Sequence, residues 1–327
     1  MKQRVDKQID YLLSKTDKIG IIEHCILDVP NYKEGYCVDD NARALQVCLR
    51  LKNKYPDLNN VLPIYLNFLK SALKKNGLNN DLNSDLSWKE NKNLGEHYGR
   101  ALASLGELIK TENKETDLFD KIYSFFNEKH SLFPRVSAQI ILGLQYYQTK
   151  DIKIWADLLI NQYLKEKKES WKWFESIISY DSGRLPMALL TAYKITNEEK
   201  YLQIGLESLD FLTKNIFNER ENYFNFPGND GWISANSKAI FDQQPIEAGS
   251  MVETYALAYK VTNNLRYKEL ASIAFDWYDG KNISKISLIN HKNGGIYDGL
   301  TKEGVNFNCG AESVLSYLLA YEAIQSI

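Results

Sequence analysis

The chain has 327 residues, 44% of them hydrophobic, which is enough to build one large domain or two ordinary ones around a sizeable core. Its 40 basic and 42 acidic residues leave a net charge of -2, so the composition gives no electrostatic case for binding nucleic acid or an anionic membrane. Aromatic residues reach 12%, most of which we expect in the core, while some would suit a sugar or ligand cleft lined by flat rings.

The N-terminal segment MKQRVDKQIDYLLSK has neither the apolar run nor the small-residue cleavage site of a signal peptide, and no stretch reaches the length of a membrane span. The four cysteines show no CxxC spacing and are expected as free thiols or small buried residues: Cys25, Cys37, Cys48 and Cys309. We therefore expect a cytoplasmic protein that does not bind a membrane.

Apolar residues recur at intervals of three and four, the helical period, and predict about twelve long helices in pairs. The first helices of the pairs span Arg4–Ser14, Asn60–Lys74, Thr116–Glu128, Ile152–Lys165, Glu198–Asn215 and Leu265–Asp279. The second helices span Asp40–Lys52, Glu96–Lys110, Val136–Gln148, Gly183–Tyr193, Pro245–Tyr259 and Ala311–Ala323. Strand-like alternation is scarce, and small hairpins are predicted only at Tyr223–Pro227 and Ile283–Tyr297.

The segments AYKITNEEKYLQIGLESLDFL and AYKVTNNLRYKELASIAFDWY form the clearest internal repeat, which is typical of an array of α/α-hairpins. Six hairpins can close into a ring with the second helices inside. No linker rich in Pro, Gly or Ser divides the chain, so the sequence predicts an all-α fold, a single (α/α)6-barrel domain over residues 1–327. The loops that lead into the inner helices are long and those that leave them are short, which assigns the function to one face of the ring.

Polar clusters stand at the starts of five of the six inner helices. In GYCVDDNARAL, two aspartates, Asp39 and Asp40, are followed by Asn41 and Arg43 and preceded by Tyr36. A helix-capping aspartate accounts for one of them, but the whole cluster exceeds what capping needs. We therefore assign these residues to a binding site.

The second cluster, GEHYGRAL, contributes His97 and Arg100, although the spacing of Glu96 and Arg100 also fits an intrahelical ion pair. HExxH is absent and the other histidines are scattered, so neither a metal site nor a cofactor is expected. The third inner helix starts with FPRVSAQ, which has Arg135 but no carboxylate, and its start is expected to be structural.

The segment WKWFESIISYDSGRLP precedes the fourth inner helix and offers Trp171, Trp173, Glu175, Asp181 and Arg184. Tryptophans two positions apart point in different directions in a helix, so we expect that the two do not both lie in the core. Arginines recur at the starts of three inner helices. They either orient carboxylates within a buried network, the commoner case, or face an anionic ligand.

The last two clusters, FDQQPIEAG and NFNCGAES, are followed by apolar helices. Two glutamines between an aspartate and a proline suit hydrogen bonding to a polyhydroxylated ligand better than core or turn positions. A capping role for Glu247 competes with this interpretation. Together with the loop motifs GNDGW and GGIYDGL, the two clusters contribute Trp232, Asp242, Gln243, Gln244, Glu247, Asp298, Asn308 and Glu312.

Paired carboxylates across a cleft are what cleavage of a glycosidic bond needs, because one protonates the leaving oxygen while the other activates water or attacks carbon. An acid with a raised pKa would suit a partly dry, aromatic-rich cleft. We expect the catalytic pair among Asp39, Asp40, Asp181, Glu247 and Glu312; Glu175 and Asp242 are further carboxylates, placed with the binding residues.

The motifs GYCVDDNARAL, WKWFESIISYDSGRLPMALL, FDQQPIEAGSMVET and GVNFNCGAESVLSYLLA resemble the (α/α)6-barrel domains of the six-hairpin glycosidase superfamily, from about His24 to Leu319. Within it the likeness is to a bacterial branch found with glycosyltransferases and mannoside phosphorylases. The resemblance implies an oligosaccharide or glycoside as substrate and a functional link to such enzymes. In HCILDVPNYKEGYC, Leu27 stands where the resemblance predicts proline.

Three functions fit these observations. The first is a glycoside hydrolase with carboxylate acid and base. The second is a sugar epimerase or lyase on the same barrel, which would draw on Tyr36, His97 and Arg100. The third is a sugar-binding module without turnover.

Overall fold

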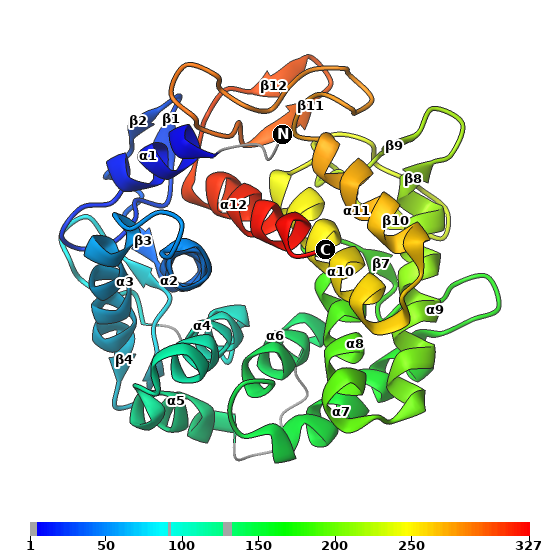
Figure 1. Cartoon of the computed structure of the whole chain (residues 1–327), viewed down its shortest axis with the longest axis horizontal. Helices are drawn as coiled ribbons and strands as arrows, with labels where there is room; N and C mark the ends of the chain where they lie inside the picture. The colour runs from blue at the N-terminus through cyan, green and yellow to red at the C-terminus, as the bar shows by residue number, and fades with distance from the viewer. Residues whose placement is uncertain (1–4, 91–92, 127–132) are drawn as a thin grey trace.

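The computed structural model describes residues 5–90, 93–126 and 133–327, and its helices form two concentric rings (Figure 1). The inner ring consists of α2 (Val38–Leu51), α4 (Glu96–Glu112), α6 (Pro134–Leu144), α8 (Arg184–Thr196), α10 (Pro245–Thr262) and α12 (Ala311–Gln325). Each inner helix contacts the next, and α12 contacts α2, which closes the ring. The predicted (α/α)6 barrel is confirmed.

The outer ring alternates with the inner one along the chain. It consists of α1 (Asp6–Ser14), α3 (Leu58–Ala72), α5 (Thr116–Tyr123), α7 (Ile152–Glu166), α9 (Glu199–Ile216) and α11 (Leu265–Asp276). Two short 3-10 helices, η1 (Ser124–Phe126) and η2 (Thr149–Asp151), extend the connections. Most helix ends lie within a few residues of those expected. The predicted start at Arg4 and the predicted end at Glu128 lie outside the described residues.

The strands are short and form two-stranded antiparallel pairs in the loops. The pairs are β1 (Cys25–Ile26) with β2 (Val29–Pro30), β3 (Tyr36–Cys37) with β6 (Asp81–Leu82), β4 (Leu73–Lys74) with β5 (Gly77–Leu78), β7 (Ile177–Ile178) with β10 (Ile233–Ser234), β8 (Phe217–Asn218) with β9 (Tyr223–Phe224), and β11 (Gly299–Thr301) with β12 (Gly304–Asn306).

One of the two predicted hairpins is in place, since β9 falls within Tyr223–Pro227. The other prediction, a small hairpin in Ile283–Tyr297, is met by a minimal one. Ile289 and Ile296 form an antiparallel bridge, flanked by hydrogen bonds from the N–H of Tyr297 to Leu288 and from the N–H of Asn290 to Gly295, both at 2.8 Å. The side-chain amide of Asn282 donates to the carbonyl oxygens of Trp277 and Ile286 and holds the start of this segment. A longer hairpin, β11 with β12, follows it.

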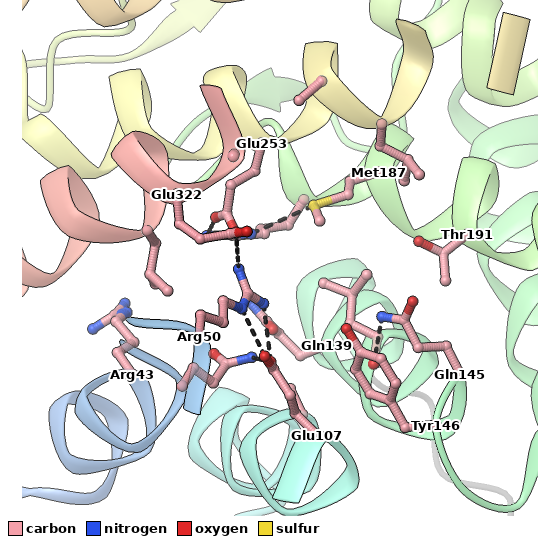
Figure 2. A pocket seen from close by; sticks show the side chains of 18 of the residues that line it. Arg43, Arg50, Glu107, Gln139, Gln145, Tyr146, Met187, Thr191, Glu253 and Glu322 are labelled. Carbon is pink, nitrogen blue, oxygen red and sulfur yellow. Dashed lines mark hydrogen bonds and ion pairs between the residues drawn. The ribbon is translucent and has the colours of Figure 1, made fainter. Parts of the chain in front are cut away.

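The centre of the inner ring is polar (Figure 2). Arg50 of α2 donates from Nε to Oε1 of Glu107 on α4 at 2.8 Å and from Nη1 to Oε1 of Glu253 on α10 at 3.0 Å. Glu322 of α12 lies 3.7 Å from the same guanidinium. On α8, Arg184 reaches the other oxygen of Glu253 at 2.6 Å. One chain of ion pairs thus joins five of the six inner helices across the lumen.

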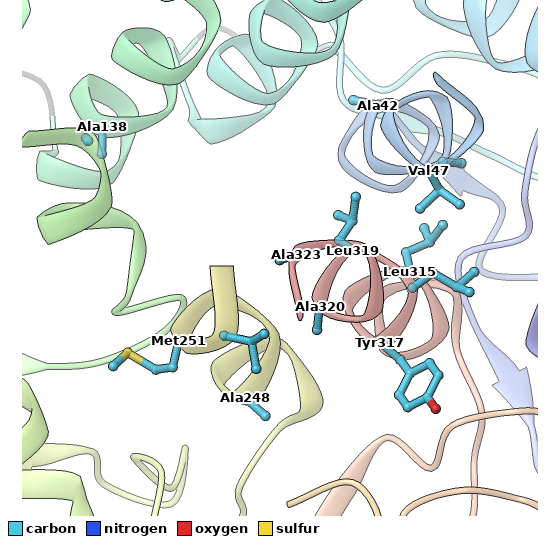
Figure 3. Packing of buried hydrophobic residues seen from close by; sticks show 14 of the residues in the cluster. Ala42, Val47, Ala138, Ala248, Met251, Leu315, Tyr317, Leu319, Ala320 and Ala323 are labelled. Carbon is cyan, nitrogen blue, oxygen red and sulfur yellow. The ribbon is translucent and has the colours of Figure 1, made fainter. Parts of the chain in front are cut away.

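The apolar core fills the space between neighbouring helices (Figure 3). Val47 of α2 and Leu315 of α12 are both fully buried where these two helices meet. Between α4 and α6 the approach is closest, because a Cβ on Gly106 would stand 2.4 Å from the backbone oxygen of Gly143. Glycine at both positions lets the two backbones touch. None of the helices in the described ranges is long and apolar enough to cross a membrane.

Candidate active site

A cavity of about 430 Å³ opens at the N-terminal ends of the inner helices, where the long loops gather. We call it the rim pocket. Its walls come from the starts of α2 and α12 and from the loops before α2, α8, α10 and α12. The residues that line it are Glu23, His24, Cys37, Asp39, Asp40, Arg43, Tyr180, Asn229, Asp242, Gln244, Asp298, Asn306, Asn308, Gly310, Glu312 and Ser313.

The two consecutive aspartates occupy the first turn of α2, where negative charge complements the helix dipole. Their carboxylates bind different arginines. Asp39 accepts from Nη1 of Arg100 at 2.8 Å, and Asp40 accepts from Nη1 of Arg43 at 2.9 Å. Burial opposes ionisation of Asp39, but Arg100 and Arg43 outweigh it and hold its pKa below the usual value. At Asp40 burial prevails over Arg43 and raises the pKa to about 6.

A second cluster joins three elements around Arg43. Its Nη2 lies 3.0 Å from the hydroxyl oxygen of Tyr180 and 3.0 Å from Oε2 of Glu312. Tyr180 in turn donates to Glu312. Burial, reinforced by Glu312, raises the pKa of Tyr180 well above its ordinary value, so the phenol keeps its proton and acts as a donor. Sequence reasoning did not select Tyr180, although it precedes Asp181 in a motif that it did select.

Glu23 is the other residue that sequence reasoning missed. It lies in the loop before β1, and its backbone is fixed at both ends: its N–H donates to Gly35 at 3.2 Å and its carbonyl accepts from Ala311, the first residue of α12, at 3.0 Å. Burial and the neighbouring carboxylates, Asp40 foremost, raise the pKa of Glu23 to about 8. The only sequence signal was its place beside His24, in the loop that leads to the aspartate pair.

The opposite wall carries the remaining predicted residues of the pocket. Asp298 accepts from the N–H of Gly310 at 2.7 Å and from the hydroxyl of Ser313 at 2.6 Å, which caps the start of α12. Burial raises its pKa despite these donors. Asn308 accepts from the N–H of Leu27 at 2.8 Å and so ties the β1–β2 hairpin to this wall. Gln244 immediately precedes α10.

Asp242 differs from the other pocket carboxylates. Its Oδ1 is buried and has no hydrogen-bond partner among the described residues. Burial is the main cause of its raised pKa, and the charges of Asp230 and Glu303 add to it. Asp242 lines the rim pocket, but its Oδ1 packs against Gly299, where an added Cβ would stand 2.7 Å from this oxygen.

Other predicted site residues lie behind the pocket as its support. Glu247 is fully buried and accepts from the N–H groups of Asp181 and Ser182 and from the Ser182 hydroxyl. Burial and Asp181 raise its pKa to about 8, against these hydrogen bonds. Asp181 itself accepts from Arg184 at 3.2 Å and lies 3.4 Å from Arg100. The three predicted arginines all bind carboxylates, which is the buried network that the sequence favoured.

Several predicted binding residues form hydrogen bonds with protein groups outside the rim pocket. His97 lies 2.9 Å from the carbonyl oxygen of Leu78, and burial lowers its pKa. Asn41 donates to the carbonyl of Cys37, and Tyr36 donates to Asp17. Gln243 is fully buried and accepts from the backbone of Phe226 and from the indole of Trp277. None of these four lines the rim pocket among the described residues.

The two predicted tryptophans of the fourth cluster, Trp171 and Trp173, are both in the core, so the expectation that they do not both lie there is wrong. The segment is a loop rather than a helix, which removes the argument from helical direction. Glu175 binds Arg135 at 2.7 Å, outside the pocket. Trp232 is half-buried in the loop before α10 and also lies outside the pocket lining.

The group of Glu23, Cys37 and Asp40 was tested as a metal site, because their ligand atoms lie within 4.8 Å of one another. The donor chemistry does not fit a cation. Asp40 is already paired with Arg43, and the Cys37 thiol donates to Asp40 at 3.4 Å. Burial raises the pKa of that thiol well above its ordinary value, so it keeps its proton. The four cysteines are buried and unbonded.

No protein-family model and no curated protein matches the chain. Solved structures match it over nearly its full length. D-mannose isomerase aligns with a TM-score of 0.77 and 10% identity, covering 99% of this chain and 96% of that one. Cellobiose 2-epimerase from Bacillus thermoamylovorans B4167 aligns with a TM-score of 0.75 and 12% identity, covering 99% of this chain and 98% of that one.

The GH76 α-1,6-mannanase from Salegentibacter sp. HEL1_6 aligns with a TM-score of 0.66 and 13% identity, covering 98% of both chains. At such identities the likeness concerns the fold. It confirms the (α/α)6 barrel, a fold that the chain shares with D-mannose isomerase, cellobiose 2-epimerase and the mannanase.

Proposed function

We propose that the chain is a glycoside hydrolase that cleaves an oligosaccharide or glycoside in the rim pocket by carboxylate catalysis. The observation that carries this proposal is the pocket itself. It gathers carboxyl groups in contrasting environments: burial raises the pKa of Glu23 to about 8, whereas beside Arg43 the pKa of Asp40 is raised only to about 6. Such contrast separates a proton donor from an ionised partner, as glycosidic cleavage requires.

The aspartate pair supports the same reading. One of the GH76 mannanase structures is an inactive variant with two consecutive aspartates replaced, in complex with α-1,6-mannotetrose. Asp39 and Asp40 are the one pair of consecutive aspartates in this sequence, and both line the rim pocket. We therefore propose Asp40 as a catalytic carboxylate and Asp39, which binds Arg100, as its charged neighbour in the pocket.

A sugar epimerase or isomerase is the second candidate, favoured by the overall likeness to two such enzymes. Moving a proton at a sugar carbon calls for a base on the pocket wall. His97 is buried, bound to Leu78, and outside the lining, which leaves His24 as the histidine of the described pocket. Because the carboxyl groups dominate the wall, hydrolysis has the stronger support.

The test is a screen of manno- and gluco-configured oligosaccharides and aryl glycosides with product analysis. We expect new reducing ends from wild type and a loss of at least 100-fold in turnover in Asp40→Asn, with circular dichroism showing that the variant is folded. Conversion of a sugar to its epimer without a new reducing end would instead support the second candidate. Binding of a sugar without formation of any product would instead support a sugar-binding module without turnover.

We also propose a cytoplasmic location for the protein and a functional link to other enzymes that act on sugars. The buried, unbonded thiols agree with a reducing cytoplasmic compartment. A functional link to a glycosyltransferase or glycoside phosphorylase follows from the sequence resemblance and is proposed on that basis alone.

A further inference from the structure

We propose that Glu23 is the proton donor to the leaving oxygen and that Asp40 is its partner, the nucleophile. This inference rests on the proposed glycosidase function and goes beyond it by assigning the second catalytic group. Both residues line the rim pocket, and an oxygen of the one lies within 4.8 Å of an oxygen of the other.

The separation decides the type of reaction. Carboxyl groups about 5–5.5 Å apart attack the sugar directly and retain its configuration, whereas about 6.5–9.5 Å is needed to seat a water for inversion. One oxygen of Glu23 lies within 4.8 Å of one oxygen of Asp40, which favours the shorter of these two separations. The pair therefore predicts retention at the anomeric carbon.

The surroundings assign the two roles. Asp40 accepts from the Arg43 guanidinium at 2.9 Å and from the Cys37 thiol at 3.4 Å, and both donors stabilise its negative charge. Glu23 faces the carboxylates of Asp40, Asp81 and Asp39, which disfavour its ionisation. Lys89 lowers the pKa of Glu23 but has the smallest influence on it, and Nε2 of the exposed His24 side chain lies 3.5 Å from the Glu23 carboxyl.

Accessibility agrees with these roles. The Glu23 side chain is 27% exposed, so it can reach a leaving group that enters from solvent. The Asp40 side chain is 4% exposed and forms the floor. The backbone bonds of Glu23 to Gly35 and Ala311 hold the carboxyl over the start of α12 without using the carboxyl itself. Replacing the carboxyl should therefore spare the fold.

The reaction balances in two steps. An oxygen of the Asp40 carboxylate forms a bond to the anomeric carbon, the glycosidic bond breaks, and the proton of Glu23 moves to the departing oxygen. Water then attacks the same carbon, its proton returns to Glu23, and the bond to Asp40 breaks. The product is a sugar with the configuration of the substrate.

The experiment compares leaving groups in Glu23→Gln. With 2,4-dinitrophenyl glycosides, whose leaving group needs no proton, formation of the glycosyl-enzyme should remain near the wild-type rate. With unactivated alkyl glycosides, which need the proton, kcat/KM should fall at least 100-fold. Azide should accelerate the variant on the dinitrophenyl substrate and yield a glycosyl azide of retained configuration. Glu34→Gln, an exposed glutamate of the same loop, is the matched control and should behave as wild type.

The outcomes separate the two proposals. Wild-type cleavage with inverted product, or a Glu23→Gln variant that loses both substrates equally while remaining folded by circular dichroism, overturns the role of Glu23 and leaves the hydrolase standing. Failure of wild type to cleave any glycoside of the panel overturns the hydrolase and this assignment with it.

Discussion

At the scale of single residues, the two carboxyl groups predict how the rate depends on pH. Burial raises the pKa of Asp40 to about 6 and that of Glu23 to about 8. Asp40 must be ionised to attack and Glu23 protonated to donate, so kcat/KM should rise through pH 6 and fall through pH 8. In Glu23→Gln, measured with a dinitrophenyl glycoside, the alkaline fall should vanish and the acid limb remain.

A profile with no alkaline limb in wild type, or with both limbs intact in Glu23→Gln, would contradict this assignment. The Glu34→Gln control should reproduce the wild-type curve.

The residues that sequence could and could not identify differ in their position. Asp39, Asp40 and Glu312 were selected because each stands in the first turn of an inner helix, and all three line the rim pocket. Glu23 lies in a loop with no periodic pattern and is brought to the pocket by backbone bonds to distant residues. Gln243 was misplaced, since a polar residue in a helix-start motif can equally be buried and paired with the indole of Trp277.

At the scale of elements, Glu247 couples two inner helices. It belongs to the first turn of α10, yet its two oxygens accept from backbone N–H groups of Asp181 and Ser182, at the approach to α8. An amide nitrogen cannot accept, whereas a carboxyl oxygen can even when protonated. In Glu247→Gln one buried donor is left without a partner, and the free energy of unfolding should fall by about 1–3 kcal/mol.

Urea unfolding followed by circular dichroism checks this prediction. Glu199→Gln, an exposed residue in the first turn of α9, is the matched control and should unfold like wild type. Unchanged stability in Glu247→Gln, together with lost turnover, would instead give Glu247 the catalytic role that the sequence first suggested.

Helix bounds were predictable because each helix buries one face, which imposes the period of three and four on the sequence. The positions of side chains in the loops were less predictable. The segment Trp171–Asp181 carries apolar and charged residues at no regular interval, and its tryptophans are placed by contacts with distant aromatics: Trp171 packs edge-on against Phe211 at 5.3 Å. Such contacts depend on the closed ring and leave no local signal.

At the scale of the whole molecule, the rim pocket and the lumen below it share Arg43 and are parts of one polar interior. Ion pairs run from Asp39 through Arg100 and Asp181 to Arg184, and from there through Glu253 to Arg50. The pocket's charges are thus anchored to the network that holds the inner ring together.

Arg50 is the position where this network should fail most clearly. Its guanidinium binds Glu107 through two nitrogens and Glu253 through a third contact, and all three side chains are largely buried (Figure 2). Arg50→Met fills a similar volume but leaves these carboxylates without their shared cation, which should cost about 3 kcal/mol in the free energy of unfolding. Urea unfolding measures the loss, and Arg220→Met, at a 92% exposed side chain, is the control.

The double variant Arg50→Met, Glu107→Gln separates charge from packing. If the loss in Arg50→Met comes from uncompensated carboxylates, removing the charge of Glu107, which Arg50 contacts through two nitrogens, should restore part of the stability. If the loss comes from the missing packing of the arginine stem, Glu107→Gln should lower the free energy of unfolding further. Recovery of stability in the double variant would show that charge pairing across the lumen holds the ring together. Neutralising Glu107 can raise the stability of Arg50→Met only if the unpaired charge of Glu107 had lowered it.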